Sequence, residues 1–337
     1  MDSALRSLLF FAFFCLLLVG GVAVFNYVQD PMCYFHCEGI DLNRRTHNVY
    51  YQAAQTLAAN PEAEVLILGS SRGERVSPRW ISEVTGLKTI NLSQGGADLL
   101  LKVALSNIAL ETNPKLKKVI WMADYFELLA MTTDAKVKWN PALSSHLPGA
   151  QSHTTWQTYL QKAKVLVDHN TFEAAVSLAR SQMFRKLGNG DDLDPQACAS
   201  ESFVGKTSAE MLPVEVSIVY PRFSSFLRMD LSPEYSQIFR EQIQKLAAKG
   251  IEVVINIAPY HPDFEKRLQL EDPRSADLQK TWVKLVEGLQ GENVKVLNYF
   301  SGIPGDDGGV KFWEDGVHPT CYAIIQMLKP GLQSSPQ

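Results

Sequence analysis

The feature that most constrains the fold is a short apolar run, Val65 to Leu68, that stops abruptly at a glycine. Every residue of the run is apolar, which is typical of a central strand covered on both faces. Gly69 is followed by two serines and an arginine. In open α/β sheets, ligands bind at the carboxyl ends of the parallel strands. The sequence therefore predicts that small hydroxyl side chains lie at the ligand-binding edge of a parallel sheet.

Four further apolar runs follow and alternate with helical stretches, which predicts a parallel sheet with crossover helices. The expected strands after the first cover residues 87–92, 118–123, 251–257 and 294–298. The expected helices cover residues 43–59, 79–85, 98–111, 232–249, 273–289 and 322–328. Between residues 128 and 230 the alternation breaks, helical periodicity appears over 155–187, and a loop rich in Gly and Asp follows at 188–195. We interpret residues 128–230 as an insertion or cap.

Residues 7–25 carry no charge and are long enough to cross a hydrocarbon core of ~30 Å. A cleaved secretory signal and an uncleaved anchor are both compatible with this run, and its length favours the anchor. Either segment would export the rest of the chain, and Arg6 before the span favours a cytoplasmic N-terminus. We expect a single-pass protein of the inner (cytoplasmic) membrane, with its soluble domain on the periplasmic or extracytoplasmic side.

The composition sets broad limits on the exported part. The chain has 337 residues, 46% of them hydrophobic, so a large core can form. The formal charge is −4 and no block of Lys or Arg occurs, which argues against a nucleic-acid partner. We expect an anchor at 7–25, a membrane-proximal lead-in at 26–60, an α/β domain formed by 61–127 and 231–330, and the insertion at 128–230.

The cysteines agree with export. Cys15 lies in the apolar run, and four cysteines remain in a compartment that permits disulfides: Cys33, Cys37, Cys198 and Cys321. Cys33 and Cys37 are close enough in sequence to pair locally, but three pairings of the four residues are possible and some thiols could be free. A metal site built from Cys33, His36 and Cys37 is disfavoured because no second ligand pair stands at zinc spacing. We expect no metal and no cofactor.

A second motif, near the C-terminus, contains a carboxylate and an imidazole, which the first motif lacks. Two residues separate Asp315 from His318. On one turn, this spacing lets the carboxylate accept a hydrogen bond from one ring nitrogen, so that the other nitrogen can take a proton from a serine. Taken singly, each motif also fits a structural role: the aspartate and the two serines can cap helices, and the histidine can be an incidental surface residue.

Together, the motifs resemble the SGNH (GDSL-like) hydrolase superfamily over about residues 62–127 and 232–330. The resemblance implies a flavodoxin-like three-layer α/β sandwich around a central parallel sheet. It also implies that Ser71 is the nucleophile, His318 the base and Asp315 the group that orients it. Residues 91–96 resemble a motif of the family. The resemblance implies that Gly96, the last of them, donates its backbone N–H to the oxyanion.

One block departs from the family pattern. The family usually has an asparagine after the third strand, where its side chain donates to the oxyanion, but Asp124 stands here. An ionised carboxylate cannot donate and would repel a developing negative charge. Arg72 could replace the missing donor or pair with Asp124. His261, at the end of the fourth strand, could contact substrate or could be a core or loop histidine.

The combination of two serines, an arginine and one N-terminal span more closely resembles membrane-anchored SGNH-like proteins of cell-envelope polysaccharide modification. This resemblance implies a serine esterase or O-acyltransferase that acts on acyl groups of an envelope glycan, and a multispan membrane protein as a possible acyl-transfer partner. The missing asparagine leaves an alternative: a weak or inactive member of the fold that binds glycan or scaffolds an export or modification complex.

Overall fold

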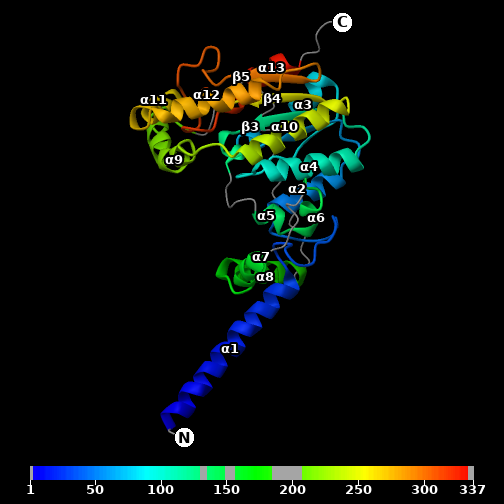
Figure 1. Ribbon diagram of the computed structural model, residues 1–337, viewed down its shortest axis with the longest axis vertical. Helices are drawn as coiled ribbons and strands as arrows, with labels where there is room; N and C mark the ends of the chain where they lie inside the picture. The colour runs from blue at the N-terminus through cyan, green and yellow to red at the C-terminus, as the bar shows by residue number, and fades with distance from the viewer. Residues whose placement is uncertain (1–2, 130–134, 149–155, 184–206, 333–337) are drawn as a thin grey trace. The chain divides into compact units, whose positions relative to one another are not determined.

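The computed structural model describes residues 3–129, 135–148, 156–183 and 207–332. The chain divides into two compact units (Figure 1). The first unit comprises residues 1–55 and 135–190, and the second comprises residues 56–134 and 191–337. The segment 128–230, expected to be one insertion, is therefore divided between the two units. The loop expected at 188–195 lies outside the described residues.

The second unit is built around a parallel sheet. Its strands are β1 (Val65–Leu68), β2 (Thr89–Asn91), β3 (Lys118–Ala123), β4 (Glu252–Ile257) and β5 (Val294–Asn298). All four neighbouring pairs are parallel, in the order β2-β1-β3-β4-β5. Each strand lies within a predicted run, so the predicted parallel sheet is confirmed. The strand order is that of flavodoxin-like folds.

Helices connect and cover these strands. In the described part of the second unit they are η1 (Gly73–Arg75), α3 (Pro78–Thr85), α4 (Leu99–Thr112), η2 (Tyr125–Leu128), α9 (Leu212–Phe226), α10 (Pro233–Ala248), α11 (Pro262–Glu271), α12 (Arg274–Glu287) and α13 (Cys321–Leu332). Asp98 accepts a hydrogen bond from Leu101 N at 3.0 Å and so caps α4. Helix α11 was not expected. It begins directly after β4, where His261 caps it and Pro262 opens it.

The helices form layers on both faces of the sheet. Trp121 on β3 packs against Phe239 of α10, and α10 also contacts α4. Val254 on β4 lies beside Gly331 of α13. Trp121 is in register with Ile255, the neighbour of Val254, and adjacent positions on a strand point to opposite faces. The α4–α10 layer and the α13 layer therefore lie on opposite faces (Figure 1).

The first unit is helical. Its described helices are α1 (Ser3–Gln29), α5 (Ala135–Lys138), α6 (Pro141–Ser144), α7 (Trp156–Leu166), α8 (His169–Met183) and most of α2 (Val49–Ala58). Residues Ala4–Gln29 of α1 have a mean hydropathy of 2.8 and form the one helix, among the described residues, that is long and apolar enough to span a membrane. A signal sequence would pass the same test of length and composition.

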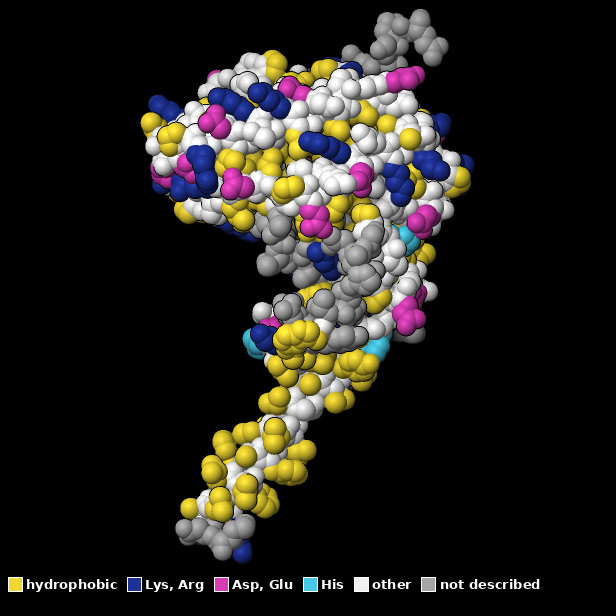
Figure 2. Space-filling model, viewed as in Figure 1, with side chains coloured by type: hydrophobic (Ala, Val, Ile, Leu, Met, Phe, Trp, Pro, Cys, Tyr) yellow, Lys and Arg dark blue, Asp and Glu magenta, His cyan; other side chains and the backbone are white. Residues whose placement is uncertain are grey.

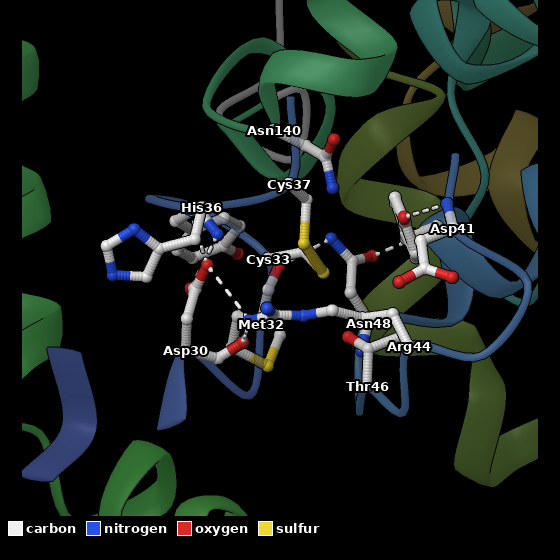
Figure 3. Close-up of a disulfide and its surroundings, with 12 residues drawn as sticks. Asp30, Met32, Cys33, His36, Cys37, Asp41, Arg44, Thr46, Asn48 and Asn140 are labelled. Carbon is white, nitrogen blue, oxygen red and sulfur yellow. Dashed lines mark hydrogen bonds and ion pairs between the residues drawn. A yellow bond between two sulfur atoms is a disulfide. The ribbon is translucent and has the colours of Figure 1, made fainter. Parts of the chain in front are cut away.

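A disulfide between Cys33 and Cys37 closes a short loop after α1 (Figure 3). Asp30 organises this loop, since its carboxylate accepts hydrogen bonds from the backbone N–H groups of Tyr34, Phe35 and His36 at 2.8–3.0 Å. Both cysteines are buried. The local pairing left open by the sequence is therefore present, and it removes the two thiolates that the disfavoured metal site needed. Cys321 is also disulfide-bonded, and Cys198 lies outside the described residues.

The turn after β1 is tightly packed. Ser70 O accepts hydrogen bonds from Gly73 N at 2.9 Å and from Glu74 N at 3.2 Å. A Cβ atom added at Gly69 would lie 2.8 Å from Gly73 Cα. One added at Gly73 would overlap the side chain of Ser93, which follows β2. Glycine at both positions lets the β1 turn pack directly against the chain that leaves β2.

We expect Gly73→Ala to destabilise the fold by about 1–3 kcal/mol, because the new methyl group cannot fit without moving Ser93 or the turn. The measurement is urea unfolding. Gly291→Ala is the matched control, since a Cβ there meets only Leu289 O at 3.8 Å, and its effect should stay within about 0.5 kcal/mol. Equal effects of the two substitutions would contradict the close approach.

Candidate active site

The structure brings the two sequence motifs together. Ser71 follows β1, and His318 lies in the loop between β5 and α13. Ser71 Oγ and His318 Nε2 are 2.8 Å apart, although 247 residues separate them in the chain. His318 Nδ1 lies 2.7 Å from Asp315 Oδ2. The three side chains thus form one continuous hydrogen-bonded series.

The environment of Asp315 determines which nitrogen of His318 carries the proton. Burial opposes ionisation of this carboxyl, but hydrogen bonds from His318 and from the N–H groups of Val317 and His318 outweigh burial and hold the pKa of Asp315 below its ordinary value of 3.8. The ionised carboxylate can only accept, so Nδ1 carries the proton and Nε2 is left as the acceptor that faces Ser71.

Several contacts hold the loop that carries His318. Glu314 forms an ion pair with Arg75 of η1, which lies four residues after Ser71. Glu314 N also donates to His318 O at 3.0 Å. These contacts join the turn that carries the serine directly to the loop that carries the histidine. Sequence reasoning did not identify this ion pair, because neither residue belongs to a recognisable motif.

A ring from α9 completes the surroundings of His318. Phe223 packs edge-on against the imidazole, with ring centroids 6.2 Å apart. Val219, one turn earlier on α9, lies beside Gly316, where an added Cβ would come within 3.1 Å of it. Sequence reasoning assigned α9 to the insertion and gave it no role at the site. The only sequence signal is the apolar spacing of Val219 and Phe223 on a single helix face.

Gly96 has a backbone conformation that favours glycine. Its φ is +72°, which glycine adopts without the strain that a side chain adds. The turn that contains it is held near β1, because Gln94 N donates to Gly69 O at 3.1 Å. Gly96 is exposed. Its role as an oxyanion donor stays a prediction.

Asp124 does not face the site as an unpaired charge. Its side chain is buried, accepts a hydrogen bond from Ser70 Oγ at 2.5 Å and pairs with Arg72 Nε at 3.3 Å. Arg72 is 4% exposed, donates to Ala258 O at 3.2 Å and lies 4.4 Å from the centre of the Tyr260 ring. Of the two roles considered for Arg72, these contacts favour the pairing with Asp124 over a substitute oxyanion donor.

A second buried ion pair lies next to Asp124. Glu127 pairs with Lys102 of α4 and accepts hydrogen bonds from Trp121 Nε1 at 3.0 Å and from Asp124 N at 2.9 Å. Burial, opposed by Lys102, raises the pKa of Glu127 to about 7. Sequence reasoning overlooked this pair. Its signal was Lys102, the single charge in the apolar stretch 99–110.

His261 is a structural residue. It is 3% exposed, and its Nδ1 accepts from Asp263 N at 3.1 Å, which caps α11. Its Nε2 lies 2.9 Å from Gly308 O. Both ring nitrogens therefore contact protein groups, and of the two roles considered for His261 these contacts favour the core or loop histidine. Among the described residues, no group of three His, Cys, Asp or Glu side chains could hold a metal ion.

The lowered pKa of Asp315 predicts a specific pH dependence of stability. Ionised Asp315 stabilises the folded chain at pH values above 3.8, and this contribution is lost as the pH falls through the lower folded-state pKa. Asp315→Asn should therefore reduce the free energy of unfolding near neutral pH, and the difference from wild type should shrink in acid. Urea unfolding across this range is the measurement. Exposed Asp277→Asn is the control, and a difference that grows in acid would contradict the assignment.

We compared the chain with known protein families, curated proteins and solved structures, and only solved structures match. No protein-family profile and no curated protein matches the chain. The chain is similar to a solved structure from Streptococcus pneumonia provisionally described as a platelet activating factor, with 13% identity, a TM-score of 0.40, and coverage of 84% of this chain and 92% of the other. It is also similar to a Bacteroides fragilis structure provisionally described as an acylhydrolase, with 12% identity, a TM-score of 0.37, and coverage of 83% and 94%. At these TM-scores the similarity carries no argument about activity.

Proposed function

We propose that this chain is an exported, membrane-anchored serine esterase or O-acyltransferase that acts on acyl groups of a cell-envelope polysaccharide. The observation that carries the proposal is the series from Ser71 Oγ through the His318 ring to Asp315, with distances of 2.8 and 2.7 Å. Nucleophile, base and orienting carboxylate at hydrogen-bond distance are what activation of a serine requires. The half-buried position of Ser71 leaves the hydroxyl open to an acyl ester.

The proposed reaction has two steps. Ser71 Oγ attacks the acyl carbonyl, His318 Nε2 takes the hydroxyl proton, and the departing alcohol receives that proton as the ester bond breaks. Water or a glycan hydroxyl then attacks the acyl-serine, His318 again takes and returns a proton, and Ser71 is released. Water as the second nucleophile gives hydrolysis, and a glycan hydroxyl gives transfer. The backbone N–H of Gly96 is the proposed oxyanion donor, and the buried Asp124–Arg72 pair holds the turn beneath Ser71.

The proposed location is a single span in the inner (cytoplasmic) membrane with the second unit on the extracytoplasmic side. The apolar α1 helix supports the anchor. The Cys33–Cys37 disulfide supports an oxidising compartment for the residues after α1. The envelope glycan as substrate and a multispan membrane protein as acyl donor rest on the resemblance of the sequence motifs.

Labelling with a fluorophosphonate and hydrolysis of p-nitrophenyl acetate test the proposal directly. We expect Ser71→Ala to abolish labelling and to lower turnover at least about 10³-fold, because the nucleophile is removed. Ser225→Ala, on the exposed surface of α9, should leave both unchanged. Ser70→Ala should reduce turnover only in part, since Ser70 Oγ holds Asp124.

Labelling that persists in Ser71→Ala would sink the assignment of the nucleophile. A wild-type protein that neither labels nor turns over ester, yet binds acylated glycan, would favour the alternative of a catalytically inactive binding protein. The buried carboxylate in place of the family's asparagine is the observation that keeps this second candidate open.

Asp124→Asn separates the two roles considered for this carboxylate. The substitution leaves the buried Arg72 without its charged partner, so we expect a loss of stability of about 3–5 kcal/mol and a fall in kcat with little change in KM. The measurements are steady-state kinetics and urea unfolding, with exposed Asp277→Asn as the control. A rise in kcat would mean instead that Asp124 repels the oxyanion.

A further inference from the structure

Helix α7 of the first unit carries an apolar stripe that faces outward. Trp156, Leu160, Ala163 and Val167 follow one another at spacings of four, three and four residues, which places them along one face of a helix. Trp156 is 69% exposed, Leu160 53% and Val167 50%. Val167 directly follows the last residue of α7 and continues its final turn, because Val167 N donates to Lys164 O at 3.1 Å.

The neighbouring helix α8 has the opposite pattern. Its apolar residues are turned inward: Ala175 and Leu178 are buried, and Phe172 packs against Phe25 of α1 with ring centroids 5.9 Å apart. Its exposed side chains include His169, Glu173 and Arg180, as on an ordinary water-facing helix. Helix α8 therefore has its partner in α1, whereas the stripe on α7 has none among the described residues.

The stripe lies at the end of the apolar span. Asn26, three residues before the end of α1, donates from Nδ2 to Leu166 O at 2.8 Å and so joins the last turn of α7 to the span. A groove of about 390 Å³ runs along α1 from Phe14 to Phe25 and is closed at one side by Phe172 of α8. Figure 2 shows apolar side chains along the length of α1. The groove therefore lies along the span, and the end of α7 lies beside the last turns of the span.

The charges on α7 favour a lipid bilayer as the surface that covers the stripe. The helix contains two lysines and no acidic residue. Lys162 Nζ donates to Tyr34 O at 2.8 Å, while Lys164 is exposed. A tryptophan and lysines beside an apolar stripe are the composition of helices that lie in the headgroup region of a bilayer.

We propose that α7 lies in the interface of a bilayer containing anionic phospholipids, with its stripe buried among the headgroups and upper acyl chains. The groove between α1 and Phe172 then holds a lipid acyl chain. This inference rests on the proposed membrane anchoring by α1 and goes beyond it. It assigns a second membrane contact to the chain and fixes the first unit at the membrane surface at two points.

Site-specific fluorescence tests the proposal in the full-length chain reconstituted in nanodiscs of phosphatidylcholine and phosphatidylglycerol. An environment-sensitive nitrobenzoxadiazole label is attached to Leu160→Cys or to Ser177→Cys, each in a Cys15→Ser background. Ser177 is exposed on α8 and is the matched control. Native Cys15, labelled in the wild-type chain, reports on the span. Lipids carrying a nitroxide at the headgroup or deep in the acyl chain are the quenchers.

We expect the headgroup nitroxide to quench the label at residue 160 roughly twofold more than the label at residue 177, and the deep nitroxide to quench the label at Cys15. Quenching at Cys15 with equal, weak quenching at residues 160 and 177 would overturn the interfacial contact and leave the anchor intact. No quenching at Cys15 would overturn the anchor and the inference together. A blue-shifted but unquenched label at residue 160 would mean that a protein surface covers the stripe, which also overturns the inference.

Discussion

The parallel pairing of the five strands is the constraint on which the second unit depends. Parallel strands direct their carboxyl ends to one edge, so the segments that leave β1, β2, β3 and β4 all emerge together. The pairing places the turn at Ser71, the turn at Gly96 and Asp124 at the same edge of the sheet. The histidine reaches the same edge by a different route, in the loop that joins β5 to α13.

Near that edge the protein buries four ionisable side chains rather than an apolar layer. Asp124 pairs with Arg72, and Glu127 pairs with Lys102, while Glu127 also accepts the backbone N–H of Asp124. Buried charges are costly unless each is paired and hydrogen-bonded, so removal of one partner disturbs the others. An aspartate at position 124 is therefore consistent with Arg72, the residue directly before η1. Under the proposed mechanism, oxyanion stabilisation then falls to backbone N–H groups.

The first unit solves a different physical problem. The segment that follows the long apolar helix α1 is held in an ordered loop. Asp30 gathers three backbone N–H groups, and the Cys33–Cys37 bond closes the loop that they form. Helix α8 covers part of α1, and α7 leaves an apolar stripe uncovered. Among the described residues of this unit, α1 carries most of the large apolar side chains that are exposed.

The sequence by itself determined the elements that depend on local pattern. The five strands, the helices α4 and α10 and the apolar span follow from periodicity. The choice of Ser71, Asp315 and His318 as one candidate set came from the resemblance of the motifs to a known family. Only the tertiary structure decided the partners of Asp124 and Arg72, the capping role of His261, the Arg75–Glu314 ion pair and the packing of Phe223 on His318. The reason is physical: a strand or cap is set by neighbours in sequence, whereas the partner of a buried charge or ring is set by whichever distant segment the fold brings within a few ångströms.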